Sequence, residues 1–496
     1  MSAWPSRRPA GGEVPRRAPD WTEATREAVA HLQALIRFPT INPPGDELAC
    51  ANHVHGVLAR EGIETTLLEP AAGRGIVIAR LRAEPGARGA TPSRAPSTSG
   101  SGRDGASGAL LLLAHMDVVG VEPEHWSVDP FAGELRDGVV YGRGAIDDKG
   151  MLAANLMAMV LAKRRLVDRG FALARDLVLV ASADEETGSR WGLEWLLAHH
   201  ADQLRAEFAL NEGGRIRIVG DAPLYAAVQT AEKVPNTVRL TARGTSGHAS
   251  VPLPDNPIVR LARALAAIGA HREPLALVPT TRRFFERLAE VWPAEAERAA
   301  MADLVSSDPA RQEHGATRMA GFPTLDALTR NGISATIVEG GIRVNVIPAE
   351  ATAVLDLRTL PGTSPDDVVA RLVDVVRDPH VEIAITARGA DAPASDLDSS
   401  MFGTIADTLT ALDPRLTVVP YMSTGATDSA RLRQAGVQTF GLLPFPLTPE
   451  DEARMHGHDE RVSVEALGFG VRVVYGIVER LLADDGSTRN GRPDER

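Results

Sequence analysis

The sequence predicts an α/β protein in which a mixed sheet, with helices on both faces, is interrupted by a smaller inserted α+β domain. Short apolar runs such as 109–113 and 176–181 alternate with helical patterns, which is typical of buried parallel strands joined by helices. In contrast, 226–243 and 333–346 alternate apolar and polar residues, as half-exposed antiparallel strands do. The change in texture after Asp221 therefore predicts a second domain.

The helices and strands follow from these two periodicities. Asp20 and Thr22 offer cap oxygens for the first helix, and Pro43-Pro44-Gly45 breaks the chain before the second. We predict helices over 23–37, 48–61, 149–166, 190–199, 256–271, 366–377, 401–412, 428–435 and 464–482. We predict strands over 63–68, 75–81, 109–113, 176–181, 208–210, 226–243, 333–346, 353–360, 381–386, 416–421 and 438–443, with an edge hairpin at 133–141.

Composition shifts place the predicted boundaries. Residues 84–107 are Gly, Ser, Pro, Ala and Arg with almost no large apolar side chain, which favours a flexible loop between two strands. The prediction is a disordered tail (1–20), a larger domain in two parts (21–228 and 351–484), an inserted domain (229–350) and a second disordered tail (485–496).

Charge and cysteine content exclude several classes. The net charge of -12 argues against nucleic-acid binding. Cys50 is the only cysteine, so an internal disulfide and a thiolate zinc site are excluded, and a helical core position is predicted for it. Because no apolar run is long enough for a membrane span and the N-terminus lacks a signal-peptide core, we predict a cytoplasmic protein, with a targeting tail as the alternative.

A His-x-Asp pair follows the buried run at 109–113. Residues two apart in extended chain face the same side, so Asp117 can hold one ring nitrogen of His115 while the other binds metal. The alternative is a buried histidine hydrogen-bonded to a nearby aspartate. The position favours a site, because α/β sheets carry their ligands at the carboxyl ends of strands.

Carboxylates recur at the ends of other predicted strands. Asp184-Glu185-Glu186 directly continues an apolar strand, where three carboxylates repel one another unless a cation neutralises them. Glu212 ends the strand at 208–210, and His456 precedes the last helix. Asp147 follows a Gly-rich turn and, taken alone, is better explained as a helix cap. Together these groups predict a site for zinc, cobalt or manganese.

These residues lie in a set of ordered motifs. They are His115-x-Asp117, Gly142-Arg143-Gly144-Ala145-x-Asp147-x-Lys149-Gly150, Asp184-Glu185-Glu186-x-Gly188, Glu212-Gly213, Gly247-His248 and His456-x-His458-Asp459-Glu460-Arg461. The set resembles the co-catalytic zinc hydrolases, which include aminoacylase, carboxypeptidase G, the carboxypeptidase S type, dipeptidases and succinyl-diaminopimelate desuccinylase. The resemblance runs from about Trp21 to Leu482, and Asn211-Glu212-Gly213-Gly214 looks most like the carboxypeptidase S type.

The resemblance implies a catalytic domain interrupted by a lid domain, and a centre of two metal ions, most often zinc. One ion would take His115, Asp147 and Glu212, and the second would take Asp147, Glu186 and His456. It also implies a cis peptide between Asp147 and Asp148. His458 is the alternative to His456 as a ligand, although the order of the motif favours His456.

The resemblance also implies roles outside the metal ligands. Glu185 would be the general base, and His248 would stabilise the oxyanion, often across a homodimer formed by the lid domains. An ordinary loop histidine is the alternative for His248. Asn345 and Arg358 resemble lid residues that touch substrate, although both could be structural residues at strand ends.

The chain departs from the family pattern at one position. Many members that bind a free carboxylate place an arginine two residues after the aspartate of a Gly-x-Thr-Asp segment. This chain has Ala430 at that position, with Arg431 and Arg433 just beyond. Either Arg431 takes over the carboxylate, or the substrate lacks that group.

The sequence therefore predicts a metallohydrolase that cleaves a peptide or N-acyl amide bond in a dipeptide or an N-acyl amino acid. A zinc aminopeptidase, or a deacylase of another small amide, is the alternative among enzymes. A dimeric binding protein on an inactivated scaffold is the alternative of another class, and the intact Glu185 argues against it.

Overall fold

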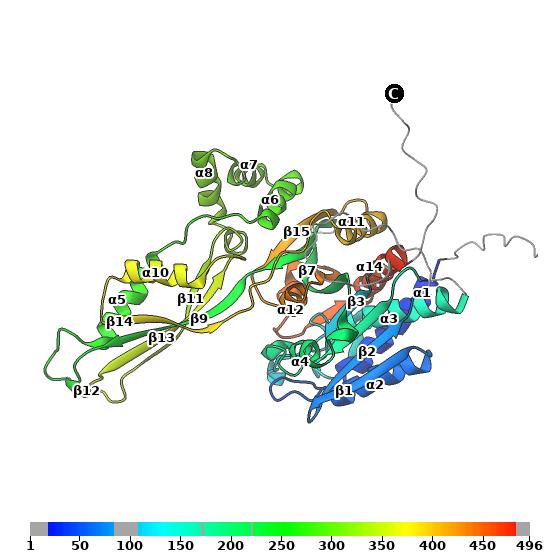
Figure 1. The fold of residues 1–496 in the computed structure, drawn as a ribbon, viewed down its shortest axis with the longest axis horizontal. Coiled ribbons are helices and arrows are strands. Elements are labelled where there is room, and N and C mark those ends of the chain that lie inside the picture. Colours follow the sequence, from blue (N-terminus) through cyan, green and yellow to red (C-terminus); the bar gives the residue numbers. More distant parts are fainter. Residues whose placement is uncertain (1–17, 84–107, 170–172, 220–221, 483–496) are drawn as a thin grey trace, which may run out of the picture.

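The computed structural model describes residues 18–83, 108–169, 173–219 and 222–482 and divides them between a larger and a smaller domain (Figure 1). The larger domain is built on an eight-stranded mixed sheet, and the smaller one, the lid domain, on a four-stranded antiparallel sheet. The predicted α/β class is confirmed. The loop predicted at 84–107 and nearly all of the two predicted tails lie outside the described residues.

The large sheet brings the carboxyl ends of two parallel strands side by side, next to the middle of a third. Its order is β1 (Glu64–Ala71), β2 (Arg74–Leu81), β6 (Leu177–Ser182), β3 (Leu110–His115), β7 (Phe208–Val219), β16 (Gln438–Leu447), β8 (Ala222–Glu232) and β15 (Thr417–Ser423). β3 runs parallel to both β6 and β7. Every residue of β3 and β6 is buried, which explains their continuous apolar sequences.

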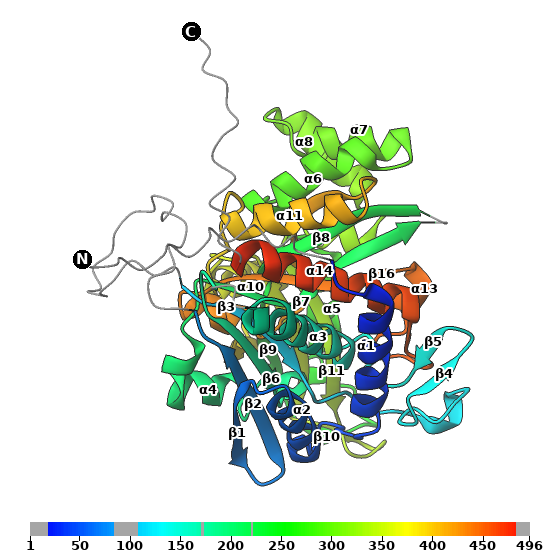
Figure 2. The ribbon, with the colours of Figure 1, turned by 90° about the vertical axis from the view of Figure 1, so that its right-hand side faces the viewer.

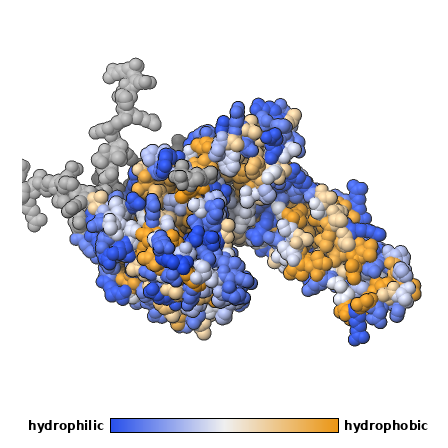
Figure 3. All heavy atoms as spheres, turned by 180° about the vertical axis from the view of Figure 1, so that it is seen from behind, coloured by the Kyte–Doolittle hydropathy of each residue, from blue (hydrophilic) through white to orange (hydrophobic). Residues whose placement is uncertain are grey.

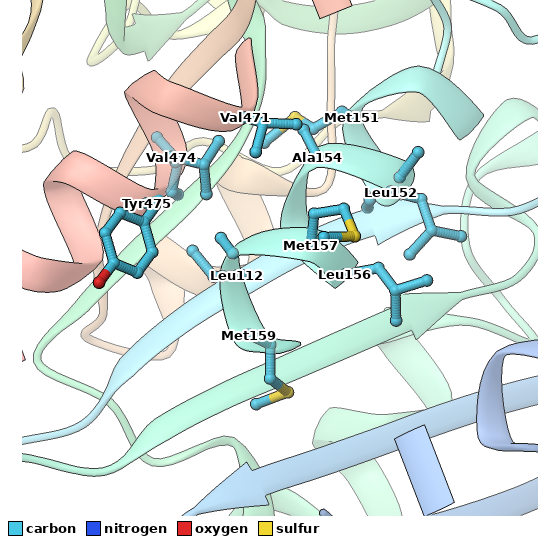
Figure 4. Close-up of a cluster of buried hydrophobic side chains, with 14 of the residues drawn as sticks. Leu112, Met151, Leu152, Ala154, Leu156, Met157, Met159, Val471, Val474 and Tyr475 are labelled. Carbon is cyan, nitrogen blue, oxygen red and sulfur yellow. The ribbon is translucent and has the colours of Figure 1, made fainter. Parts of the chain in front are cut away.

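One face of this sheet carries the main hydrophobic core. Its helices are α1 (Trp21–Ile36), α2 (Leu48–Arg60), α3 (Lys149–Arg165), α11 (Ser400–Leu412) and α14 (Val464–Leu482). Figure 4 shows α3 between strand residue Leu112 and the α14 side chains Val471, Val474 and Tyr475. Because α3 is buried all round from Lys149 to Ala162, it shows no polar stripe. Figure 2 shows α1, α3 and α14 packed together.

The opposite face is covered by shorter helices. Leu193 and Leu196 of α4 (Leu193–His199), and Leu432 of α12 (Ser429–Gln434), join the core beneath β3 and β6. Farther along, β8 and β15 support a helical group that no pattern noted in the sequence predicts. It comprises α6 (Pro279–Val291), α7 (Glu295–Leu304), α8 (Pro309–Met319) and α9 (Pro323–Asp326). Phe284 anchors this group through ring contacts to Tyr225 and Tyr421.

The lid domain lies at the opposite end of the molecule from α1 and α3 (Figure 1). Its strands, in order, are β11 (Gly332–Gly340), β13 (Glu350–Thr359), β9 (Val234–Arg243) and β14 (Val381–Arg388). Helices α5 (Pro257–Ala270) and α10 (Pro365–Val376) share a core with this sheet, in which Leu261 and Leu372 are buried. A two-stranded pairing of β10 (Gly247–His248) and β12 (Val346–Ile347) forms the tip.

Two predictions about this region are wrong. The stretch 226–243 is two strands, because β8 pairs within the large sheet and β9 within the lid. The return to the larger domain was predicted at residue 351, yet β13 and β14 both pair with β9, and α10 packs in the lid core. Backbone pairing with a strand more than a hundred residues earlier decides this, and local periodicity carries no information about it.

Smaller elements complete the larger domain. The predicted hairpin at 133–141 is confirmed as β4 (Glu134–Arg136) and β5 (Val139–Tyr141), and β17 (Arg461–Ser463) adds a third strand. The turn helix α13 (Pro449–Glu452) precedes β17. Single turns of 3-10 helix lie at η1 (Pro123–His125), η2 (Val167–Arg169), η3 (Glu185–Thr187) and η4 (Ala201–Leu204). Among the described residues, no helix has the length and apolar character needed to cross a membrane.

Candidate metal centre

The five predicted ligands come from five separate elements of the larger domain. His115 is the last residue of β3, Glu212 lies in the neighbouring strand β7, and Glu186 lies in η3, just after β6. Asp147 stands in the turn before α3, and His456 in the turn after α13. The end of β3, the interior of β7 and the 3-10 turn after β6 thus supply three of the ligands, and turns supply the other two.

Asp147 lies at the junction of two groups of candidate ligands. The first group is His115, Asp147 and Glu212, and the second is Asp147, Glu186 and His456, with the ligand atoms of each group within 4.8 Å of one another. Oδ1 of Asp147 is 3.1 Å from Nε2 of His115, and Oδ2 is 3.1 Å from Nε2 of His456. Each carboxylate oxygen therefore faces one group, as a carboxylate shared by two ions would.

The charges of the centre fit two cations. Burial raises the pKa of Glu212 well above its usual range, and the carboxylates of Asp147 and Glu185 raise it further. Hydrogen bonds to Asp147 and Glu186 raise the pKa of His456 to about 10. Both shifts favour the protonated forms of these side chains, and divalent cations would take the place of those protons. Two imidazoles and three carboxylates, with no thiolate, suit zinc, cobalt or manganese.

Asp117 joins a candidate ligand to the loop of the predicted base. Its Oδ1 lies 3.4 Å from Nδ1 of His115, and its backbone oxygen lies nearer, at 2.9 Å. The carboxylate also accepts hydrogen bonds from the backbone N–H groups of Glu185 and Glu186, each at 3.1 Å. Asp117 therefore orients the imidazole and holds the η3 turn.

Glu460 holds the turn that carries Asp147. This fully buried carboxylate accepts backbone hydrogen bonds from Gly144, Ile146 and Asp147 at 2.8 to 3.0 Å. It also forms an ion pair with buried Arg143 at 2.7 Å. Glu460 stands within the last of the sequence motifs, and that place is a usable signal, although no role is predicted for it from the sequence. The peptide between Asp147 and Asp148 is cis, as the resemblance implies.

Asn42 is a second residue that sequence reasoning missed. Its side-chain amide donates to Asp117 Oδ2 at 2.9 Å and to Asp184 Oδ1 at 3.0 Å, and its oxygen accepts from Arg74 at 3.1 Å. The sequence signal in this stretch is only Pro43-Pro44-Gly45, which breaks the chain before the second helix. The sequence around a polar residue in a turn does not show which distant residues its side chain will contact in the fold.

The predicted lid residues do not join this centre within one chain. His248 and Asn345 lie together at the lid tip, where His248 pairs with Val346 and the backbone oxygen of Asn345 accepts from Ala249. Figure 1 shows the tip far from the carboxyl ends of β3 and β7. Arg358 lies at the other end of β13, where its guanidinium contacts Asp356 at 3.0 Å.

Three further residues are placed by their contacts. Arg431 donates to the backbone oxygen of Gly188, the residue after η3, at 2.6 Å, so it borders the centre. His458 is turned toward Glu122, and its ring contacts that of His125 at a tilt, whereas His456 faces Asp147. Cys50 is fully buried in α2, and burial raises the pKa of its thiol to about 11. Both observations agree with the predicted core position.

Named proteins resemble this chain over most of its length. A human protein named N-fatty-acyl-amino acid synthase/hydrolase PM20D1 is 28% identical over 393 residues, covering 77% of this chain and 76% of that protein. A probable carboxypeptidase S-like 2 from Dictyostelium discoideum is 29% identical, covering 75% and 71%. Human aminoacylase-1 is also 29% identical, covering 75% and 80%.

Solved structures share the fold. The M20 family metallo-carboxypeptidase Sso-CP2 from Sulfolobus solfataricus aligns with a TM-score of 0.65 at 19% identity, covering 91% of this chain and 98% of that one. The Bacillus subtilis YXEP protein, described as a dinuclear metal-binding peptidase from the M20 family, aligns with a TM-score of 0.56 at 14% identity, covering 93% and 99%.

The family model described as peptidase family M20/M25/M40 matches residues 111–480, a span that contains all five candidate ligands. The chain therefore belongs to peptidase family M20/M25/M40 and is a metallohydrolase of that family.

Proposed function

We propose that this chain uses two divalent metal ions, zinc or alternatively cobalt or manganese, to hydrolyse the amide bond of a dipeptide or an N-acyl amino acid. The observation that carries the proposal is Asp147, whose two oxygens each face one group of ligands. The names of the relatives support the substrate class, because they include a fatty-acyl-amino acid hydrolase and an aminoacylase.

The residues have distinct roles in this proposal. Two bound cations would lower the pKa of a shared water and polarise the scissile carbonyl. Glu185 takes a proton from the attacking water and delivers it to the leaving amine. Its buried surroundings support this role, since burial, Asp428 and Glu186 all raise its pKa and so favour holding a proton. Asp117 fixes both the imidazole of His115 and the backbone of Glu185.

The lid would serve the neighbouring subunit of a homodimer. β11 is an edge strand of the lid sheet, and Ile337 and Val338 on it are 52% and 63% exposed. Ile258 of α5 is 43% exposed, and Figure 3 shows broad hydrophobic areas on this domain. An exposed apolar edge of this kind favours association. In such a dimer His248 stabilises the oxyanion in the other subunit's site, because it lies far from its own.

The proposed substrate contacts are Asn345 from the lid tip, Arg358 from the lid sheet, and Arg431 beside η3. Arg431 binds the substrate carboxylate in place of the arginine absent at Ala430. Its position next to Gly188 supports this role. Its side chain is also 28% exposed, so a ligand can reach it from solvent.

The test is a panel of dipeptides, N-acetyl amino acids and N-fatty-acyl amino acids, assayed with added zinc, cobalt or manganese and with a chelator. We expect hydrolysis of one class, abolished by the chelator and restored by metal. Glu185→Gln should keep its metal and lose at least about a hundredfold in kcat. The exposed Glu286→Gln is the matched control and should behave as wild type. Full activity in Glu185→Gln would refute the mechanism.

The two alternatives predict different results. An aminopeptidase requires a free amino terminus, so it would cleave dipeptides and leave every N-acylated substrate intact. A binding protein on an inactivated scaffold would hold no zinc, cobalt or manganese in metal analysis and would hydrolyse nothing in the panel.

A further inference from the structure

The turn that carries His456 is attached to the rest of the domain on both sides. On the side after His456, Arg143 donates to the backbone oxygen of Gly457 at 2.8 Å and pairs with Glu460 at 2.7 Å. Because Glu460 also holds the backbone of Asp147, this attachment fixes the turn to the shared ligand. It does not hold residues 453–455, which connect α13 to His456.

Two ionic attachments hold the segment before His456: Asp451 of α13 pairs with Arg461 at 3.0 Å, and a three-charge cluster holds the end of the same helix. Glu452, the last residue of α13, directs one carboxylate oxygen to Arg215 and the other to Arg217, with the second contact at 2.7 Å. Both arginines lie on β7, the strand that carries Glu212. The side chain of Glu452 is 12% exposed, whereas the arginines are 38% and 30% exposed. The cluster is therefore partly shielded from water and ties α13 to β7.

Two hydrogen-bonded turns connect Glu452 to His456. Met455 N–H donates to the backbone oxygen of Glu452 at 3.2 Å, and Gly457 N–H donates to that of Arg454 at 2.8 Å. His456 itself has a φ of +58° and a side chain that is 52% exposed. Little packing surrounds the imidazole, so its position depends on the turns and on what anchors them.

We propose that Glu452, Arg215 and Arg217 are positioning residues for the second metal group. These residues join the segment before His456 to β7, the strand that holds Glu212. They therefore fix the position of the second group of ligands relative to the first. This inference rests on the proposed centre of two metals. The first group does not depend on the cluster, because pairing within the large sheet holds β3 and β7 together.

The test is metal binding to the apo-protein, measured by calorimetric titration with zinc and by the visible spectrum with cobalt, in wild type and Glu452→Gln. We expect wild type to bind two ions. Glu452→Gln should bind the first as wild type does and the second at least about tenfold more weakly. The exposed Glu450→Gln removes one charge from the same helix and should match wild type.

A double-substitution series separates positioning from general stability. Arg215→Met with Arg217→Met should weaken the second ion as Glu452→Gln does, and adding Glu452→Gln to that pair should weaken it no further. Thermal melting of the apo-proteins reports any loss of the fold. Two ions bound with unchanged affinities in a folded Glu452→Gln would overturn the inference, whereas fewer than two ions in wild type would instead refute the proposed centre.

Discussion

The carboxylate of Asp117 accepts a hydrogen bond from the backbone N–H of Glu185 at 3.1 Å. The same side chain lies against Nδ1 of His115, so one residue connects a candidate ligand with the proposed base. Movement of the imidazole cannot therefore be independent of movement of the base. Substitutions here should affect metal binding and turnover together.

Asp117→Asn should weaken zinc binding by about 10- to 100-fold and lower kcat as well. The amide places N–H hydrogens where a carboxylate oxygen now accepts from Glu185 or Glu186, so the η3 turn must shift. Zinc titration and initial rates at saturating zinc measure the two effects. Exposed Asp407→Asn is the control. A variant with normal kcat and normal zinc affinity would contradict the role given to Asp117.

Asp147→Ala should lose both ions, whereas Glu212→Ala and His456→Ala should each lose one. The reason is that only Asp147 belongs to both groups. Elemental analysis after dialysis against limiting zinc gives the number of ions per chain. Two ions retained by Asp147→Ala would contradict the proposal that Asp147 is a ligand of both.

His248→Ala and Glu185→Gln should each be nearly inactive as homodimers and should regain activity when mixed. A mixed dimer contains one site with both residues intact, because His248 would act in the other subunit's site. Subunits are exchanged by mild denaturation and refolding, and each variant refolded alone is the control. No recovery, with dimers shown to have mixed, would mean that His248 does not act in the other subunit's site.

Gly214→Ala should destabilise the large sheet by about 1–3 kcal/mol. A Cβ at this position would overlap the backbone oxygens of Gly441 and Ala227, on the two strands flanking β7 there, and backbone atoms cannot swing aside. Gly269→Ala, in helix α5 with open space around it, should be neutral or stabilising. Urea unfolding of both variants makes the comparison, and equal midpoints would contradict it.

The larger domain was predictable because its buried strands have recognisable, continuously apolar sequences. β3 and β6 are buried on both faces, so apolar side chains run without interruption through each. The recognised family is confirmed. The lid boundary was not predictable in this way, since Glu350–Thr359 forms a strand whichever sheet it joins, and its partner β9 is chosen by tertiary pairing.

The candidate metal centre was predictable at positions where the residue types and their spacing are typical of metal ligands and a catalytic base. His115 with Asp117, and Glu185 with Glu186, stand in motifs directly after apolar strands, so the sequence places them at one edge of the sheet. Their roles stay predictions. The pairing of Glu452 with Arg215 could not be foreseen, because the two residues are 237 positions apart and charged residues of this kind are common on surfaces.

Asp147 and His456 touch across 309 positions of the chain. During synthesis the second group of ligands cannot exist until nearly the whole chain has left the ribosome. The residues of the first group end at Glu212, yet the turn that carries Asp147 is held by Glu460 near the end of the chain. A chain interrupted before residue 456 would therefore lack both one candidate ligand and the carboxylate that holds the shared one.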